Sequence, residues 1–226
     1  MTDIKLIACD MAGTTIDEHG DVYRALENSV AENGVEVKPE DLQTWMGADK
    51  VEAITALLKL GGHEADDATV QKSFDRFREL LSEYYAANPP VGLPGVEAAL
   101  RELKNAGMKI SLTTGFSADV AGPLLESLGW KIGDLLDAVV TSDEVEAGRP
   151  YPYMIQKAME RTGVTDPAQV LVAGDTVVDA QAGARAEAGM VCGVLTGKLD
   201  EKGFEGTGAT HVIGSVADLP AMLLNS

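Results

Sequence analysis

The sequence is short of basic residues. Only 18 lysines and arginines stand against 36 aspartates and glutamates in 226 residues, a formal net charge of -18. Nucleic acids and anionic membranes are bound mainly through clustered Lys and Arg, so this balance argues against both as partners. We expect most of the acidic residues to serve solubility and only a few to take part in chemistry.

Cysteine and long apolar stretches are also scarce. Cys9 and Cys192 form neither a CxxC pair nor a cluster with histidine, which argues against a zinc site and a disulfide framework. No apolar stretch approaches the roughly 18 residues of a membrane span, and no secretory signal is recognisable. The expected location is the cytoplasm, and 45% apolar residues suffice for one core domain with an insertion.

The chain does contain short apolar runs that alternate with helical patterns. The runs are IKLIACD, MKISLTTG, DAVVTSDE, QVLVAGD, MVCGVLTG and THVIGS. Helical patterns lie between the later runs, at residues 96–106, 118–128, 151–162 and 178–188. This alternation predicts an α/β fold with a Rossmann-like, doubly wound parallel sheet and helices on both faces.

The interval between the first two predicted strands breaks the alternation. From Glu18 to Asn88 the periodicity is helical, with four expected helices at 24–33, 42–46, 51–60 and 69–87. Pro89 and Pro90 then mark a hinge back to the core. We therefore expect a catalytic core of residues 1–17 and 91–226 and an inserted α-helical cap domain of residues 18–90 over its active edge.

Acidic residues end two of the predicted strands. Asp10 precedes the turn Ala12-Gly13-Thr14-Thr15, and Asp175 is followed four residues later by Asp179. Ligands of open α/β sheets bind beyond the carboxyl ends of the strands, and Mg²⁺ prefers carboxylates, water and substrate phosphate. The sequence predicts a magnesium site at Asp10, Asp175 and Asp179, with Asp10 as a nucleophile that forms an aspartyl-phosphate.

Other groups at the same edge suit a phosphate ligand. The Thr114 hydroxyl, beside the flexible Gly115, is expected to donate to a phosphate oxygen, as are groups of Gly13 and Thr176. Arg149 provides a permanent cation for the charge that builds during phosphoryl transfer. Asp143, which follows a further strand, is expected at this edge as well.

The order of these features resembles the haloacid dehalogenase superfamily along essentially the whole chain, in the type with a helical cap after the first strand. A finer resemblance, to the phosphonoacetaldehyde hydrolase (phosphonatase) family and its phosphonatase-like relatives, is carried by three stretches. They are DMAGTTID, with Ala12 in place of the usual second acid, MGADK in the cap, and AGRPYPYM, with Arg149 where the superfamily more often has lysine.

This resemblance implies a ligand set and a catalytic lysine. It implies Mg²⁺ bound by Asp10, the Ala12 carbonyl oxygen and Asp175, and it makes Lys50 a Schiff-base residue. Met46 and Gly47, in the same cap stretch, are then expected at the substrate. The implied partner is a small phosphorylated or phosphonate substrate, and the family implies a possible homodimer through the cap. Trp45, Leu57 and Leu58 are candidates for its interface, although apolar residues at helical spacing more often form internal core.

The chemistry explains why Ala12 and Lys50 belong together. Breaking a P–C bond expels a carbanion, which an acid placed for a leaving oxygen does not help. If Lys50 first condenses with an aldehyde, the protonated imine accepts the electrons and a neutral enamine departs. The amine must then be uncharged near neutral pH, which we expect burial to favour.

Two substitutions leave an alternative open. The phosphonatase family has a histidine three residues after its lysine and a tyrosine after the second-strand Thr-Gly, where this chain has Ala53 and Phe116. Ala53 favours a phosphomonoesterase acting on phosphoglycolate or a small sugar phosphate, whereas Ala12 argues against one. An alternative of another class is a catalytically silent protein that binds a phosphorylated ligand.

Overall fold

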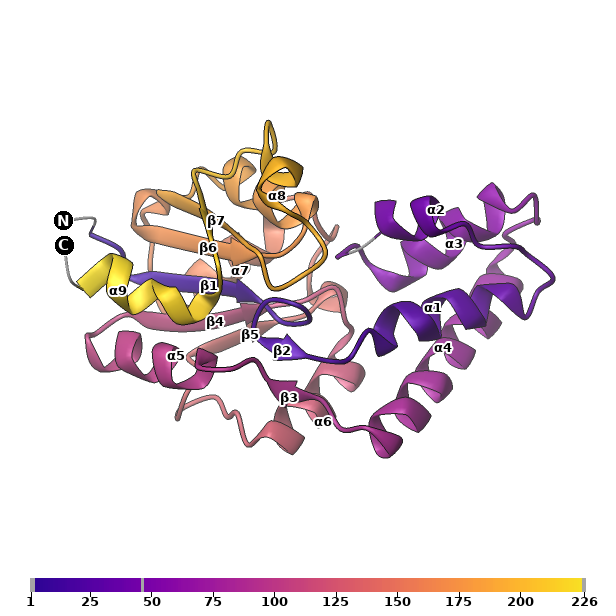
Figure 1. The fold of residues 1–226 in the computed structure, drawn as a ribbon, viewed down its shortest axis with the longest axis horizontal. Coiled ribbons are helices and arrows are strands. Elements are labelled where there is room, and N and C mark those ends of the chain that lie inside the picture. Colours follow the sequence, from indigo (N-terminus) through magenta and orange to yellow (C-terminus); the bar gives the residue numbers. More distant parts are fainter. Residues whose placement is uncertain (1–2, 46, 225–226) are drawn as a thin grey trace. The chain divides into compact units, whose positions relative to one another are not determined.

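The computed structural model describes residues 3–45 and 47–224 (Figure 1). The chain divides into two compact units, here called the core unit, Met1–Asp17 with Val91–Ser226, and the helical unit, Glu18–Pro90. Within the described residues, no helix combines the length and the apolar character needed to cross a membrane.

The core unit is built on a parallel sheet. In the described part of the chain this sheet has six strands in the order β5-β4-β1-β6-β7-β8, and all of its neighbouring strands run parallel. The strands are β1 (Leu6–Asp10), β4 (Lys109–Thr113), β5 (Ala138–Val140), β6 (Val170–Gly174), β7 (Met190–Val194) and β8 (His211–Ile213). The predicted α/β class and the six predicted strands are confirmed.

Strand β1 lies inside the sheet and carries Asp10 at its carboxyl end. All five of its residues are buried, as expected for a central parallel strand covered on both faces. Its neighbours are β4 and β6, and Asp10 stands in register with Thr113 of β4. The strand order reverses beside β1, so Asp10 ends at the point where ligands of open α/β sheets bind.

Helices follow the strands of the core unit, and the sequence predicts the first four of them. They are α5 (Val96–Asn105), α6 (Ala118–Leu128), α7 (Tyr153–Thr162), α8 (Val177–Arg185) and α9 (Leu219–Leu224), with the short 3-10 helices η1 (Ser142–Glu144), η2 (Pro167–Gln169), η3 (Glu201–Phe204) and η4 (Val216–Asp218). Gly129 and Gly163 end α6 and α7 at φ 71° and 74°, a left-handed conformation that favours glycine.

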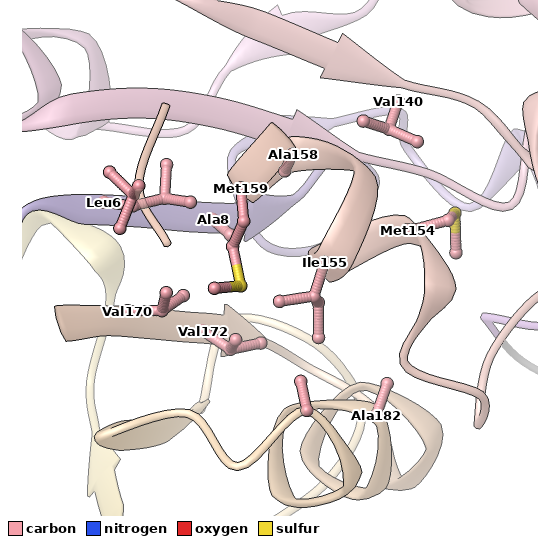
Figure 2. Close-up of a cluster of buried hydrophobic side chains, with 12 residues drawn as sticks. Leu6, Ala8, Val140, Met154, Ile155, Ala158, Met159, Val170, Val172 and Ala182 are labelled. Carbon is pink, nitrogen blue, oxygen red and sulfur yellow. The ribbon is translucent and has the colours of Figure 1, made fainter. Parts of the chain in front are cut away.

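A buried apolar cluster joins α7 and α8 to one face of the sheet. Figure 2 shows side chains of α7, among them Ile155 and Met159, gathered with those of β1, β6 and α8. Leu6 and Ala8 contribute from β1 because alternate residues of a strand share a face. This cluster stabilises the strands whose ends carry the acidic residues.

The chain leaves and re-enters the core unit through a pair of short strands. β2 (Ile16–Asp17) and β3 (Val91–Gly92) pair antiparallel, with Ile16 opposite Gly92. The sequence pattern did not predict this ribbon, because two-residue strands carry no periodicity. It joins the turn after β1 to the start of the segment that leads into α5.

The helical unit contains α1 (Asp21–Ala31), α2 (Pro39–Thr44), α3 (Lys50–Leu60) and α4 (Asp67–Ala87). Polar contacts connect the turn after α1 to α4: Asn33 Nδ2 donates to Ser73 Oγ at 2.9 Å, and Arg76 pairs with Glu32 at 3.0 Å. Leu57 and Leu58 are buried in α3, so these two candidates for a dimer interface are internal core. Trp45 is half-buried.

Candidate active site

Three acidic side chains converge at the carboxyl edge of the sheet. Asp10 ends β1, Asp175 follows β6 and Asp179 lies in the first turn of α8. One carboxylate oxygen from each lies within 4.8 Å of the others, and all three side chains are buried. The structure therefore brings together the three acids that the sequence predicts as metal ligands.

Arg149 is the cation of this cluster. Its Nη1 lies 2.7 Å from Asp10 Oδ1 and 2.8 Å from Asp179 Oδ1, and only 5% of the residue is exposed. These two contacts qualify as ion pairs by their N···O distances. The well-aligned hydrogen bonds of the guanidinium come from Nη2, which donates to the Thr113 carbonyl oxygen at 2.8 Å and to the Thr113 hydroxyl at 3.1 Å.

Asp175 is held by groups that approach it closely. The Thr14 hydroxyl donates to Asp175 Oδ1 at 2.9 Å. A Cβ atom on Gly13 or Gly197 would lie only 2.6 Å or 2.1 Å from Asp175 Oδ2, so both positions require the absence of a side chain. Gly13 also has φ +86°, which glycine adopts without strain. The backbone thus encloses this carboxylate from two sides.

Asp179 is oriented by the start of α8. Thr176 is the N-cap residue, and its amide donates to Asp179 Oδ2 at 3.0 Å while its hydroxyl contacts the same oxygen. This reciprocal capping box satisfies amides at the helix start. The Thr176 hydroxyl, predicted to bind phosphate, is therefore directed to Asp179.

The acids raise one another's affinity for protons. Burial raises the pKa of Asp10 to about 6, with the Arg149 charge opposing the rise and the Asp179 charge adding to it. Burial also raises the pKa of Asp175, with further contributions from the charges of Asp10 and Asp179. Three close carboxylates against one guanidinium favour a divalent cation, and hard oxygen ligands are those that Mg²⁺ selects. The residues present fit a magnesium ion.

Other predicted phosphate ligands have different surroundings. Thr114 is buried and its hydroxyl accepts from the Phe116 amide at 3.1 Å, while Gly115, also buried, lies between them. The Gly13 amide donates to the Ile16 carbonyl oxygen at 2.9 Å. This amide is engaged within its own turn.

Asp143 does not join the acid cluster. Its Oδ1 accepts from the Thr141 hydroxyl at 2.6 Å and from the Ala118 amide at 3.1 Å, at the start of α6. Asp143 follows β5 at the carboxyl edge of the sheet, as expected, but it caps a neighbouring turn and is not one of the three clustered acids.

The predicted substrate residues of the cap stretch belong to the helical unit. Lys50 is the first residue of α3, is 5% exposed, and its Nζ donates to the Ala48 carbonyl oxygen at 2.6 Å. Asp49 caps the helix by accepting from the Val51 amide at 2.9 Å. Gly47 has φ +76°. Met46 lies outside the described residues.

Sequence reasoning missed three residues of the site. Thr14, Thr113 and Gly197 contact the acids or Arg149, yet none was singled out. No sequence signal separates Thr113 from Thr114, because only the register of β4 with β1 shows that Thr113 stands opposite Asp10.

An acid cluster with an arginine, at the carboxyl edge of a parallel sheet, is suited to a divalent metal ion and to phosphate chemistry. The chain belongs to the haloacid dehalogenase-like hydrolases, whose family model matches residues 4–187. It is a hydrolase of that family.

Individual relatives are more distant. A phosphonoacetaldehyde hydrolase of Bacillus cereus is 31% identical over 215 residues, which cover 87% of this chain and 78% of that protein. A phosphonoacetaldehyde hydrolase-like protein of Oleispira antarctica superposes with a TM-score of 0.83 at 22% identity, covering 99% of this chain and 92% of that one. A β-phosphoglucomutase of Clostridium difficile superposes with 0.84 at 18% identity, covering 98% and 96%. These structural likenesses show the fold alone, since proteins named for different reactions fit equally well.

Proposed function

We propose that the protein is a Mg²⁺-dependent phosphohydrolase that cleaves phosphonoacetaldehyde or a close analogue through an aspartyl-phosphate. One observation carries the proposal: Asp10 lies in the buried acid cluster, and Ala12, two residues on, has no acid that would protonate a leaving oxygen. A site built this way suits a substrate whose leaving group is carbon. The likeness to phosphonoacetaldehyde hydrolases at about 30% identity supports the same substrate class.

In this proposal the acids divide into a nucleophile and metal ligands. Asp10 attacks phosphorus, while Asp10, the Ala12 carbonyl oxygen and Asp175 hold Mg²⁺, with Asp179 beside them. The ion, when bound, neutralises negative charge on the carboxylates and the phosphoryl oxygens, which permits the approach of two anions. Arg149 binds the transferring group opposite Asp10, and Thr114 with Gly115 contacts its oxygens.

The role proposed for Lys50 is covalent. Its uncharged amine adds to the aldehyde, and loss of water with uptake of one proton leaves a protonated imine. When Asp10 attacks phosphorus, the P–C bond breaks and its electron pair moves into the imine, which forms a neutral enamine on Lys50. Protonation at carbon and hydrolysis then release acetaldehyde, and water hydrolyses the aspartyl-phosphate. The reaction needs Lys50 and Asp10 at one substrate, which makes the helical unit a cap domain in function.

The low exposure of Lys50 supports this role. Addition to an aldehyde requires the uncharged amine, and removal of an amine from water favours that form. The side chain is 5% exposed, unusual for a lysine that serves only solubility.

A second candidate function is a phosphomonoesterase with the same core. This chain has Ala53 and Phe116 where the phosphonatase family has a histidine and a tyrosine. Ala53 is fully buried and Phe116 is 3% exposed. Without those groups an imine has fewer partners for proton transfer. A phosphate ester of phosphoglycolate type would then be the substrate, with water protonating the leaving oxygen.

A kinetic comparison separates the two functions. Phosphate release would be measured with Mg²⁺ from phosphonoacetaldehyde and from a panel of small phosphate esters. Lys50→Arg keeps the charge but cannot form an imine, and we expect it to lower kcat/KM for phosphonoacetaldehyde more than about a thousandfold. Lys59→Arg, at the exposed end of the same helix, is the matched control.

A loss below about tenfold in Lys50→Arg, with turnover of phosphate esters, would assign the phosphomonoesterase instead. Binding of phosphate esters without turnover of any substrate would identify a catalytically silent protein.

A further inference from the structure

The arginine of the active site rests on two neighbouring strand ends. Asp10 of β1 and Thr113 of β4 are partners in the sheet register. Arg149 comes from the segment between β5 and α7 and contacts both of them, Asp10 through Nη1 and Thr113 through Nη2. The guanidinium therefore lies across the carboxyl ends of two adjacent strands.

The geometry of these contacts constrains the guanidinium plane. A guanidinium is rigid, and its N–H groups point in fixed directions within one plane. Nη2 donates to the carbonyl oxygen and to the hydroxyl of Thr113, at 2.8 Å and 3.1 Å. Because both acceptors belong to Thr113, they fix the orientation of Nη2. The guanidinium is rigid, so its Nη1 is then directed toward Asp10 and Asp179.

Burial increases the importance of these contacts. Thr113 is 4% exposed and Arg149 is 5% exposed, so water does not readily replace the hydroxyl. In such surroundings an N–H donor without an acceptor raises the free energy of the folded protein. The guanidinium would therefore shift until this donor meets another acceptor. Asp179 fixes the opposite end of the guanidinium and is itself fixed by Thr176.

We propose that Thr113 is a positioning residue for phosphoryl transfer, whose hydroxyl orients Arg149 so that Nη1 faces the phosphoryl group at Asp10. This inference rests on the proposed function, in which Arg149 binds the transferring group. Thr113 acts through Arg149 and not on the substrate, whereas the neighbouring Thr114 was expected to contact phosphate itself. In this proposal Thr113 supports the arginine, and Thr114 contacts the ligand.

Four variants test the role of the hydroxyl. Thr113→Val keeps the shape of the side chain and removes the hydroxyl, and Thr113→Ser restores it. Ser111→Ala removes a buried hydroxyl on the same strand two residues earlier, which contacts the Leu112 carbonyl oxygen. Arg149→Lys carries one nitrogen, which cannot contact the two acids and Thr113 together.

Two quantities would be measured for each variant and for Thr113→Val combined with Arg149→Lys. One is the dissociation constant of inorganic phosphate in the presence of Mg²⁺, by isothermal titration calorimetry. The other is kcat/KM for whichever substrate the wild-type protein hydrolyses. Thermal unfolding confirms that each variant is folded.

We expect Thr113→Val to weaken phosphate binding and to lower kcat/KM by about tenfold each. Thr113→Ser and Ser111→Ala should remain within about threefold of wild type. In the Arg149→Lys background, Thr113→Val should change either quantity by less than about twofold, because the group it orients is absent.

Phosphate binding by the wild type with no effect of Thr113→Val, or an equal loss in both backgrounds, would overturn this inference and leave the proposed function standing. A folded wild-type protein that neither binds phosphate nor hydrolyses any phosphate or phosphonate would refute the proposed function, and this inference with it.

Discussion

The Thr14 hydroxyl donates a hydrogen bond to Asp175 Oδ1 at 2.9 Å, although the two residues are 161 positions apart in the sequence. Both are buried, and the bond joins the turn after β1 to the end of β6. A donor to one carboxylate oxygen fixes the direction of the other, as groups behind metal ligands commonly do. The two strand ends that hold the acids are thus connected by a side chain.

Thr14→Val keeps the shape of the residue but removes this donor. We expect the Mg²⁺ concentration that gives half-maximal activity to rise about tenfold, because the Asp175 carboxylate loses its orientation. The measurement is a Mg²⁺ titration of activity. Thr207→Val, which removes a buried hydroxyl that donates to the Phe204 carbonyl oxygen, is the control. Equal shifts in the two variants would show that the Thr14 bond does not serve the metal site.

Asp10→Asn replaces the nucleophile with a group of the same shape. Turnover should fall by at least about a thousandfold, since an amide does not form the acyl phosphate. Circular dichroism and thermal unfolding should show a folded protein, because the substitution also relieves repulsion from Asp175. Asp143→Asn, an acid that caps α6, should keep its activity. Activity of Asp10→Asn within tenfold of wild type would contradict a covalent mechanism.

Gly197→Ala introduces a methyl group against the acid cluster. Its Cβ would lie 2.1 Å from Asp175 Oδ2 and 2.7 Å from the Asp175 Cβ, so the carboxylate must move. We expect activity to fall about a hundredfold at a fixed Mg²⁺ concentration, with part of the loss recovered at higher Mg²⁺.

The control for that change is Gly122→Ala in α6, where an added Cβ meets nothing within 4 Å. It should leave activity unchanged, with no gain in helix stability, because Pro123 follows and crowds a Cβ on the preceding helical residue. Normal Mg²⁺ dependence in Gly197→Ala would mean that the segment after β7 moves away and that Asp175 does not.

Glu144 provides a pH-dependent contribution to stability. Hydrogen bonds from Arg161, with one from the Thr141 amide, hold the pKa of this carboxyl at about 2, although burial opposes the shift. The unfolded chain takes up the proton near pH 4.5. The stabilisation is therefore complete above that pH and is lost as the pH falls toward 2.

Glu144→Gln removes that contribution. About a third of each partner of the Arg161–Glu144 pair is exposed, so screening limits the loss at pH 7 to about 1 kcal/mol of unfolding free energy. Urea unfolding at pH 7 and at pH 3 should show a smaller difference between variant and wild type at pH 3. A difference that stays constant or grows on acidification would mean that the carboxylate is not stabilised in its charged form.

The sequence predicts the sheet and the helical insertion because their signals are local. Buried parallel strands appear as apolar runs, and the insertion shows helical periodicity over its length. The approach of Asp10 to Asp175 follows as well, since parallel strands end at one edge. These features need no knowledge of side-chain direction.

Details that depend on contacts between distant segments are not accessible in this way. Thr113 and Thr114 are adjacent and alike, and only the register with β1 shows which one meets Arg149. Gly197 touches Asp175 through the return of the chain after β7. Asp143 has the sequence context of a site acid, yet the local turn uses it as a cap.

The most direct test of the proposed reaction is to trap the imine. The protein would be incubated with phosphonoacetaldehyde and Mg²⁺, treated with borohydride, and digested for mass spectrometry while phosphate release is assayed. The proposed mechanism predicts an N-ethyl or N-phosphonoethyl group on Lys50, absent from exposed Lys59, together with phosphate release. Phosphate release with no adduct on Lys50, or equal labelling of Lys59, would contradict it.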